Sequence, residues 1–137
     1  MSESRIDYAI TLHQKGYNCA QAIVCAYADL FGIDQETAYK MSEGFGLGMG
    51  MMEVCGALSG GVMLAGLKNS AGADAPGKTK GSTYKLNRTL GEAFQKETGS
   101  VLCHELKGRD TGKPIYPCDA CIRHGAKIVE EYLLSEK

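Results

Sequence analysis

The most reactive side chains of this 137-residue chain are its six cysteines. Cys118 and Cys121 form a CxxC pair directly after Pro117, where a helix is expected to begin. Residues three apart share a helix face, so the two sulfurs can meet as a disulfide or bind one metal ion. A helix N-terminus also stabilises negative charge, which lowers the pKa of a thiol placed there. The pair therefore indicates redox or metal chemistry.

Two further cysteines are expected near the starts of helices. A variant capping box that begins at Asn18 puts Cys19 in the first helical position. Cys55 is expected in the first turns of a later helix, where small residues, among them Gly56 and Gly60, leave the backbone bare beside the thiol. A partner could therefore approach Cys55 closely, and Gly56 and Gly60 are the candidate contacts for a cofactor. Small residues four apart also let another helix pack closely.

The other cysteines and the histidines are weaker candidates. Cys25 lies mid-helix among apolar residues, where free cysteine usually acts as a small hydrophobic side chain. Cys103 and His104 adjoin in a short turn and could contribute ligands to a metal site. For His124, on the last helix, an exposed position is favoured, and His13 is expected to be structural or on the surface.

Helical spacing must position these side chains, because no segment shows the period-two alternation of strands. Gly16, Gly32 and Gly99 are expected to end helices, and Asp34 is expected to cap the start of one. The expected helices cover residues 6–15, 19–31, 35–43, about 54–68, about 84–98 and about 118 onward.

Glycine at every second position from Gly44 to Gly50 predicts a loop. Each glycine costs a helix interior about 1 kcal/mol relative to alanine, so a helix would not tolerate four of them in this short stretch. The sequence therefore predicts an all-α fold, a single domain over residues 1–137. It is a bundle of five or six helices, with the glycine-rich loop before the central helix that carries Cys55.

Two other patterns are set aside. Residues 72–79 match the letters of a P-loop, but Pro76 removes a backbone donor and Asp74 would place an anion in the phosphate cradle. A solvated linker is the better interpretation. The methionines of residues 49–52 could bind a soft metal, yet methionine more often fills irregular gaps beside glycine.

Composition and charge exclude several classes of function. The formal net charge of −1, without a local basic stripe, argues against nucleic-acid binding. The N-terminal sequence lacks the pattern of a signal peptide, and the apolar run Val54–Leu67 is too short and too rich in glycine to span a bilayer. We therefore expect a cytoplasmic protein, in which cysteines serve redox or metal chemistry more often than structural disulfides.

The separated cysteine motifs resemble the redox-active C-GCAxxG-C-C family. The likeness rests on NCAQA at residues 18–22, CGALSG at residues 55–60, Cys103 and the final CxxC pair, and it covers nearly the whole chain. The central motif here takes the form CGAxxG, and Cys25 is an extra cysteine. The resemblance implies a redox-active protein, and it defines neither the substrate nor the partner.

Our leading hypothesis is a thiol-based redox protein whose cysteines converge from separate helices. We expect Cys55 to be the attacking thiolate, with one of the other cysteines resolving the mixed disulfide. Such chemistry would suit a thiol–disulfide oxidoreductase that exchanges electrons with a redox partner protein or a small-molecule thiol. The candidate catalytic residues are Cys19, Cys55, Cys103, Cys118 and Cys121.

The alternative hypothesis is a protein that binds a metal ion or an iron–sulfur cluster through the same thiolates. The candidate ligands are Cys55, Cys103, Cys121 and His104. The sequence leaves a homodimer open, and it names neither the electron donor nor the substrate.

Overall fold

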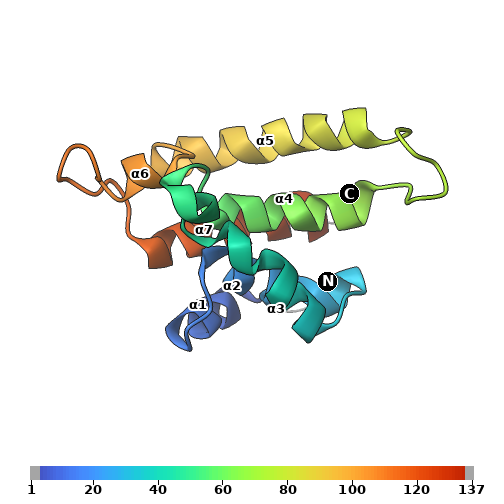
Figure 1. Cartoon of the computed structure of the whole chain (residues 1–137), viewed down its shortest axis with the longest axis horizontal. Coiled ribbons are helices and arrows are strands. Elements are labelled where there is room, and N and C mark those ends of the chain that lie inside the picture. The colour runs from blue at the N-terminus through green and yellow to red at the C-terminus, as the bar shows by residue number, and fades with distance from the viewer. Residues whose placement is uncertain (1–3, 135–137) are drawn as a thin grey trace.

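The computed structural model describes residues 4–134, and these residues form an all-α bundle (Figure 1). Extended pairing within this part of the chain is limited to an isolated bridge between Val54 and Leu102. None of the helices in residues 4–134 combines the length and the hydropathy that crossing a bilayer requires. The all-α fold class predicted from the sequence is confirmed.

Seven α-helices, joined by short helical turns and loops, make up the described residues. The α-helices are α1 (Ile6–Gln14), α2 (Cys19–Tyr27), α3 (Gln35–Ser42), α4 (Gly56–Asn69), α5 (Lys80–Thr98), α6 (Cys103–Leu106) and α7 (Cys118–Val129). The short turns are η1 (Ala28–Phe31), η2 (Glu43–Phe45), η3 (Gly48–Met52) and η4 (Glu130–Leu134).

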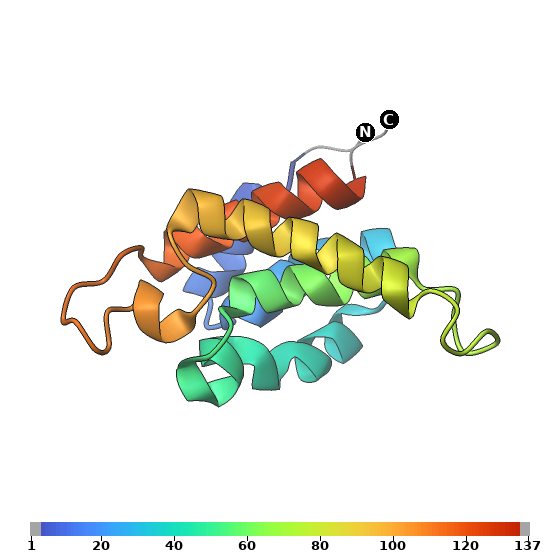
Figure 2. The same ribbon diagram turned by 90° about the horizontal axis from the view of Figure 1, so that it is seen from above.

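The helices are stacked in three layers (Figure 1). The long helix α5 covers α4 and α7, and these two pack in turn on α1 and α2, with α3 beside α2. The single turn α6 and the beginnings of α4 and α7 gather at one end of the bundle, beside the loop 107–117 (Figure 2). Three chain segments that are far apart in sequence therefore meet at that end.

Local signals explain most of the helix boundaries. Asn18 Oδ1 accepts a hydrogen bond from Gln21 N at 2.9 Å, and Gln21 Oε1 accepts one from Asn18 N at the same distance. This is the capping box expected before Cys19. Asp34 caps α3 by accepting from Thr37 N at 2.9 Å, and Gly99 ends α5 with a φ of 97°.

Three boundaries differ from the prediction. The helix α2 ends at Tyr27, and the chain continues to Phe31 as a 3₁₀ turn. Cys55 is the N-cap of α4 rather than a residue of its first turns. The segment Cys103–Leu106 forms a helix of its own, which makes the number of α-helices in the described residues seven instead of five or six.

Glycines let α4 approach its neighbours closely. A Cβ atom added at Gly60 would lie 2.9 Å from Ile23 Cβ and 3.0 Å from the carbonyl oxygen of Ala20, both on α2. A Cβ atom at Gly125, on α7, would lie 2.8 Å from the carbonyl oxygen of Ala57 on α4. Because neither position tolerates a side chain, α2, α4 and α7 pack with their backbones close together.

The glycine-rich loop forms the turns η2 and η3 rather than a regular helix. Leu47 and Met49 adopt positive φ angles of 53° and 61°, which residues with a Cβ rarely do. A Cβ atom at Gly48 would lie 2.4 Å from Glu53 N, so this position accepts only glycine. The expectation that the loop methionines fill gaps is wrong for Met49 and Met51, which are 43% and 60% exposed because the tight turns point them outward.

Candidate functional site

Five of the six cysteines line one cavity of about 190 Å³ at the end of the bundle where α4, α6 and α7 begin. These residues are Cys19, Cys55, Cys103, Cys118 and Cys121. The sixth, Cys25, is buried in the core, and its thiol lies 3.9 Å from the carbonyl oxygen of Gln35. Burial raises the pKa of Cys25 to about 11, which fits the inert core role expected for it.

Three of the cavity cysteines lie at the N-termini of helices longer than the single turn α6, which begins at Cys103. Cys19 and Cys118 occupy the first positions of α2 and α7, and Cys55 is the N-cap of α4. The partial positive charge of a helix N-terminus, carried by its free N–H groups, stabilises a thiolate. Three such termini converge on the cavity, and their partial positive charges favour a thiolate there.

A short backbone bridge holds Cys55 and Cys103 in neighbouring positions. Cys55 N donates to the carbonyl oxygen of Val101 at 2.8 Å, and Cys103 N donates to the carbonyl oxygen of Glu53. These two bonds flank the Val54–Leu102 bridge. They tie the start of α4 to the start of α6 across a wide gap in sequence.

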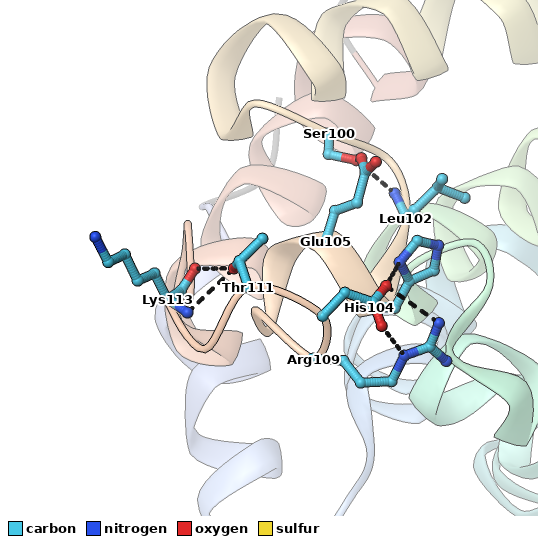
Figure 3. Close-up of polar contacts among 8 residues, drawn as sticks. Ser100, Leu102, His104, Glu105, Arg109, Thr111 and Lys113 are labelled. Atoms are coloured by element: carbon cyan, nitrogen blue, oxygen red, sulfur yellow. Dashed lines mark hydrogen bonds and ion pairs between the residues drawn. The ribbon is translucent and has the colours of Figure 1, made fainter.

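Side chains next to this bridge fix α6 (Figure 3). Ser100 Oγ accepts a hydrogen bond from Leu102 N at 3.0 Å and donates to the carboxylate of Glu105. Ser100 is buried, so its hydroxyl is held in one arrangement. The backbone that carries Cys103 is therefore set by local polar contacts as well as by the bridge.

Cys19 and Cys118 form what we call the outer pair. A hydrogen bond from Cys19, together with Lys107 Nζ at 3.3 Å from the Cys118 sulfur, lowers the pKa of Cys118 to about 5. The same hydrogen bond and burial raise the pKa of Cys19. Both residues are half-buried. At neutral pH the outer pair is therefore a thiolate on Cys118 beside a thiol on Cys19.

Cys55 and Cys121 form what we call the inner pair, and both are buried, with exposed fractions of 5% and 2%. A hydrogen bond from Cys121 lowers the pKa of Cys55, and the backbone N–H groups of Ala57 and Leu58 lower it further. The pKa of Cys121 is raised by the same hydrogen bond and by burial. Burial and the nearby Cys55 raise the pKa of Cys103.

Three other ionisable side chains of the cavity were not identified as site residues from the sequence: His13, Lys107 and Tyr116. His13 Nδ1 lies 2.7 Å from Asp119 Oδ1, and Tyr116 Oη lies 2.6 Å from His124 Nε2. The expectation that His124 is exposed is wrong, because Tyr116 and neighbouring helices cover it and leave its side chain 19% exposed. No local sequence signal marked these residues, since their partners lie on other elements.

Two of the predicted site residues lie apart from the cavity. Gly60 packs against α2, as described above. His104 faces the loop that follows α6, where its Nδ1 lies 3.5 Å from Asp110 Oδ2 and Arg109 lies alongside (Figure 3). Gly56 does line the cavity, and a Cβ atom there would lie 3.1 Å from Cys19 Cβ. Within residues 4–134, no three His, Cys, Asp or Glu side chains are grouped so that they could hold one metal ion.

Comparison with known proteins gives one match. A family model described as "Putative redox-active protein (C_GCAxxG_C_C)" matches residues 17–132. The matched region contains all five cavity cysteines and leaves out His13. No curated protein and no solved structure matches the chain.

Proposed function

Because the chain belongs to this C_GCAxxG_C_C family, whose description supports a general redox role, we propose that it is a thiol–disulfide oxidoreductase. The observation that carries the proposal is the cavity in which two pairs of cysteines meet. In each pair a cysteine at a helix start accepts a hydrogen bond from a second thiol, and this hydrogen bond lowers the pKa of the accepting cysteine. A thiolate beside a thiol is the reduced form of a dithiol ready for exchange.

The first step is attack by Cys118 on a substrate disulfide, RS–SR. Cys118 suits this role because its pKa of about 5 makes it ionised at neutral pH, and because it is half-buried rather than enclosed. A bond forms between the Cys118 sulfur and one substrate sulfur as the substrate S–S bond breaks. The other sulfur leaves with the bonding electron pair as RS⁻ and takes up a proton.

The second step is resolution by Cys19. Its thiol hydrogen-bonds to Cys118, so it is already next to the mixed disulfide that the first step forms. Cys19 loses its proton and attacks the Cys118 sulfur, and the second RS⁻ leaves. The substrate gains two electrons and becomes two thiols, while the outer pair becomes a disulfide.

The inner pair is suited to a later exchange. Cys55 is the residue expected from the sequence to attack first, but at 5% exposure it offers little access to a substrate. Attack by the Cys55 thiolate on the oxidised outer pair, followed by resolution by Cys121, would move the disulfide inward and regenerate the outer thiols. A redox protein or a small-molecule thiol, as found in a reducing cytoplasm, would then reduce the inner disulfide.

Counting free thiols tests the proposal. The reduced protein is treated with glutathione disulfide, unfolded, and titrated with a thiol reagent, and peptide mass mapping identifies the linked cysteines. We expect two thiols to disappear for each disulfide formed, a Cys19–Cys118 link, and full recovery with dithiothreitol. The variant Cys25→Ala is the matched control, because Cys25 lies outside the cavity and its loss should leave the number of oxidisable thiols unchanged. An unchanged thiol count in the wild type contradicts the proposal.

Binding of a metal ion or an iron–sulfur cluster by the same cysteines is the second candidate function. The convergence of Cys55, Cys103 and Cys121 on the cavity favours it. The side chains as they stand in residues 4–134 do not form a ligand group, so binding would require them to rotate. Metal analysis and visible absorption after anaerobic purification test this candidate, and stoichiometric metal would support it.

A further inference from the structure

His13 and Asp119 form a polar pair at the edge of the cysteine cavity. His13 lies in the last turn of α1, and Asp119 follows Cys118 in the first turn of α7. The 2.7 Å contact joins His13 Nδ1 to Asp119 Oδ1. An ionised carboxylate can only accept, so Nδ1 carries the hydrogen and donates it to Asp119. The other ring nitrogen, Nε2, is left to exchange protons.

Thiol exchange at the outer pair needs a group that can both donate and accept a proton. A leaving thiolate of ordinary basicity requires a proton, and Cys19 must lose one before it attacks Cys118. Histidine is the side chain whose ordinary pKa lets it do both near neutral pH. Of the residues that line the cavity, His13 is the one histidine.

The other polar side chains of the cavity make contacts that leave His13 as the candidate acid–base group. Lys107 hydrogen-bonds to Cys118, and this contact raises the pKa of Lys107, so it keeps its proton and stabilises the thiolate. The hydroxyl group of Tyr116 hydrogen-bonds to His124 Nε2 at 2.6 Å. The ionisable groups that share the cavity or its edge with His13 are Cys19 on α2, Cys55 at α4, Cys103 on α6, Lys107 and Tyr116 beyond α6, and Cys118, Asp119 and Cys121 on α7.

We propose that His13, held in place by Asp119, is the acid–base group of the thiol exchange at the outer pair. As the imidazolium, His13 donates the Nε2 proton to the first leaving thiolate, RS⁻, which departs as RSH. As the neutral imidazole it then removes the proton from Cys19, which attacks the Cys118–SR bond. The second leaving thiolate takes its proton from water, so His13 ends the cycle protonated as it began. This role rests on the proposed function.

Electrostatics in the cavity are consistent with this placement. The hydrogen bond from Cys19 is the largest cause of the lowered pKa of Cys118, and the charge of protonated His13 adds to the lowering. The same imidazolium therefore stabilises the attacking thiolate before the reaction and supplies a proton during it. Asp119 acts through His13, because its side chain sets the tautomer and the orientation of the ring.

Two disulfides with different leaving groups test the proposal. 5,5′-Dithiobis(2-nitrobenzoate) releases a weakly basic thiolate that needs no proton, whereas bis(2-hydroxyethyl) disulfide releases a strongly basic thiolate that does. Single-turnover rate constants are measured for the reduced wild type and for His13→Gln with each disulfide. We expect His13→Gln to slow the hydroxyethyl reaction about 10²-fold more than the nitrobenzoate reaction, the scale of general acid catalysis. Asp119→Asn should shift the ratio in the same direction by a smaller factor.

The controls separate this role from the function on which it rests. His104→Gln is the matched variant, since His104 lies outside the cavity, and it should leave the ratio unchanged. Equal slowing of both disulfides by His13→Gln and by Asp119→Asn would show that His13 acts only through the pKa of Cys118 or through structure, and would overturn the proposal. A wild type that reacts with neither disulfide overturns the proposed exchange itself. If His13→Gln fails to fold, the Asp119→Asn ratio decides, because that exposed side chain is 60% accessible.

Discussion

The outer and inner pairs use the same local device and differ in their surroundings. In each pair a hydrogen bond between the two thiols lowers the pKa of one cysteine and raises the pKa of the other. The outer pair adds Lys107 and partial exposure, whereas the inner pair has only backbone N–H groups and is buried. The difference between the pairs shows that a hydrogen bond between two thiols lowers the pKa of one of them, while exposure and a nearby cation decide which cysteine meets a substrate.

The largest effect is expected from replacing Cys118, the proposed nucleophile of the outer pair. Cys118→Ser should lower the rate of attack on a disulfide by more than about 10³-fold, because the nucleophile itself is removed. Cys121→Ser should slow that first attack far less, since the hydrogen bond of Cys121 is made to Cys55 and not to Cys118. Single-turnover kinetics measure both rates, and Cys25→Ser serves as the control outside the cavity. Equal losses in Cys118→Ser and Cys121→Ser would remove the distinction between the pairs.

The contact between α4 and α2 joins the inner pair to the outer pair, and Gly60 lies in that contact. Gly60→Ala should destabilise the protein by about 1–3 kcal/mol, the usual range for overpacking, because the new methyl group meets Ile23 and the backbone of α2. Gly91→Ala on α5 is the matched control. No atom lies within 4 Å of a Cβ there, so it should stabilise the protein by about 1 kcal/mol through helix propensity.

Chemical denaturation of the reduced variants measures both changes in the free energy of unfolding. A neutral or stabilising Gly60→Ala would show that α4 has room beside α2, and the close approach of the two pairs would lose its explanation.

The pH dependence of alkylation sharpens the comparison further. The thiolate of Cys118 forms as the pH rises through about 5, so its reaction rate with iodoacetamide should rise through that pH and level off above it. Lys107→Gln removes the nearby cation and should raise the midpoint by about 1 pH unit. Cys55, although its pKa is also lowered, should react slowly at every pH because it is buried.

Mass spectrometry of the alkylated peptides identifies each site in that experiment. The core residue Cys25, with a pKa raised to about 11, is the internal reference and should react only in strong base, if at all. A midpoint for Cys118 near the ordinary thiol pKa, unchanged in Lys107→Gln, would contradict the electrostatic difference between the pairs.

The smallest effect is expected from replacing two helix N-cap residues. Asn18→Ala and Asp34→Ala each remove an N-cap and should each cost about 1 kcal/mol of stability. Only Asn18 precedes a cavity cysteine and lines the cavity, so only Asn18→Ala should also change the alkylation rate of Cys19. Thermal unfolding and peptide-resolved alkylation measure the two quantities. Equal reactivity of Cys19 in both variants would show that the cap serves α2 alone.

Helix boundaries could be predicted from the sequence where they depend on a few adjacent residues. The capping box at Asn18, the cap at Asp34 and the stop at Gly99 were predicted because each requires only neighbouring backbone and side-chain groups. Burial of Cys25 followed from the apolar residues around it. The outward-facing Met49 was missed, because its position depends on positive φ angles that the residue types themselves disfavour.

The all-α fold, most of the helix ends and the family of the cysteine motifs could be predicted from the amino-acid sequence, since each depends on short stretches of neighbouring residues. The folded structure was needed to show which cysteine pairs with which, that Lys107 and His13 line the same cavity, and that His104 does not. The physical reason is that these contacts join segments up to about a hundred residues apart. Their geometry is set by close glycine-mediated packing of α2, α4 and α7, which no local pattern encodes.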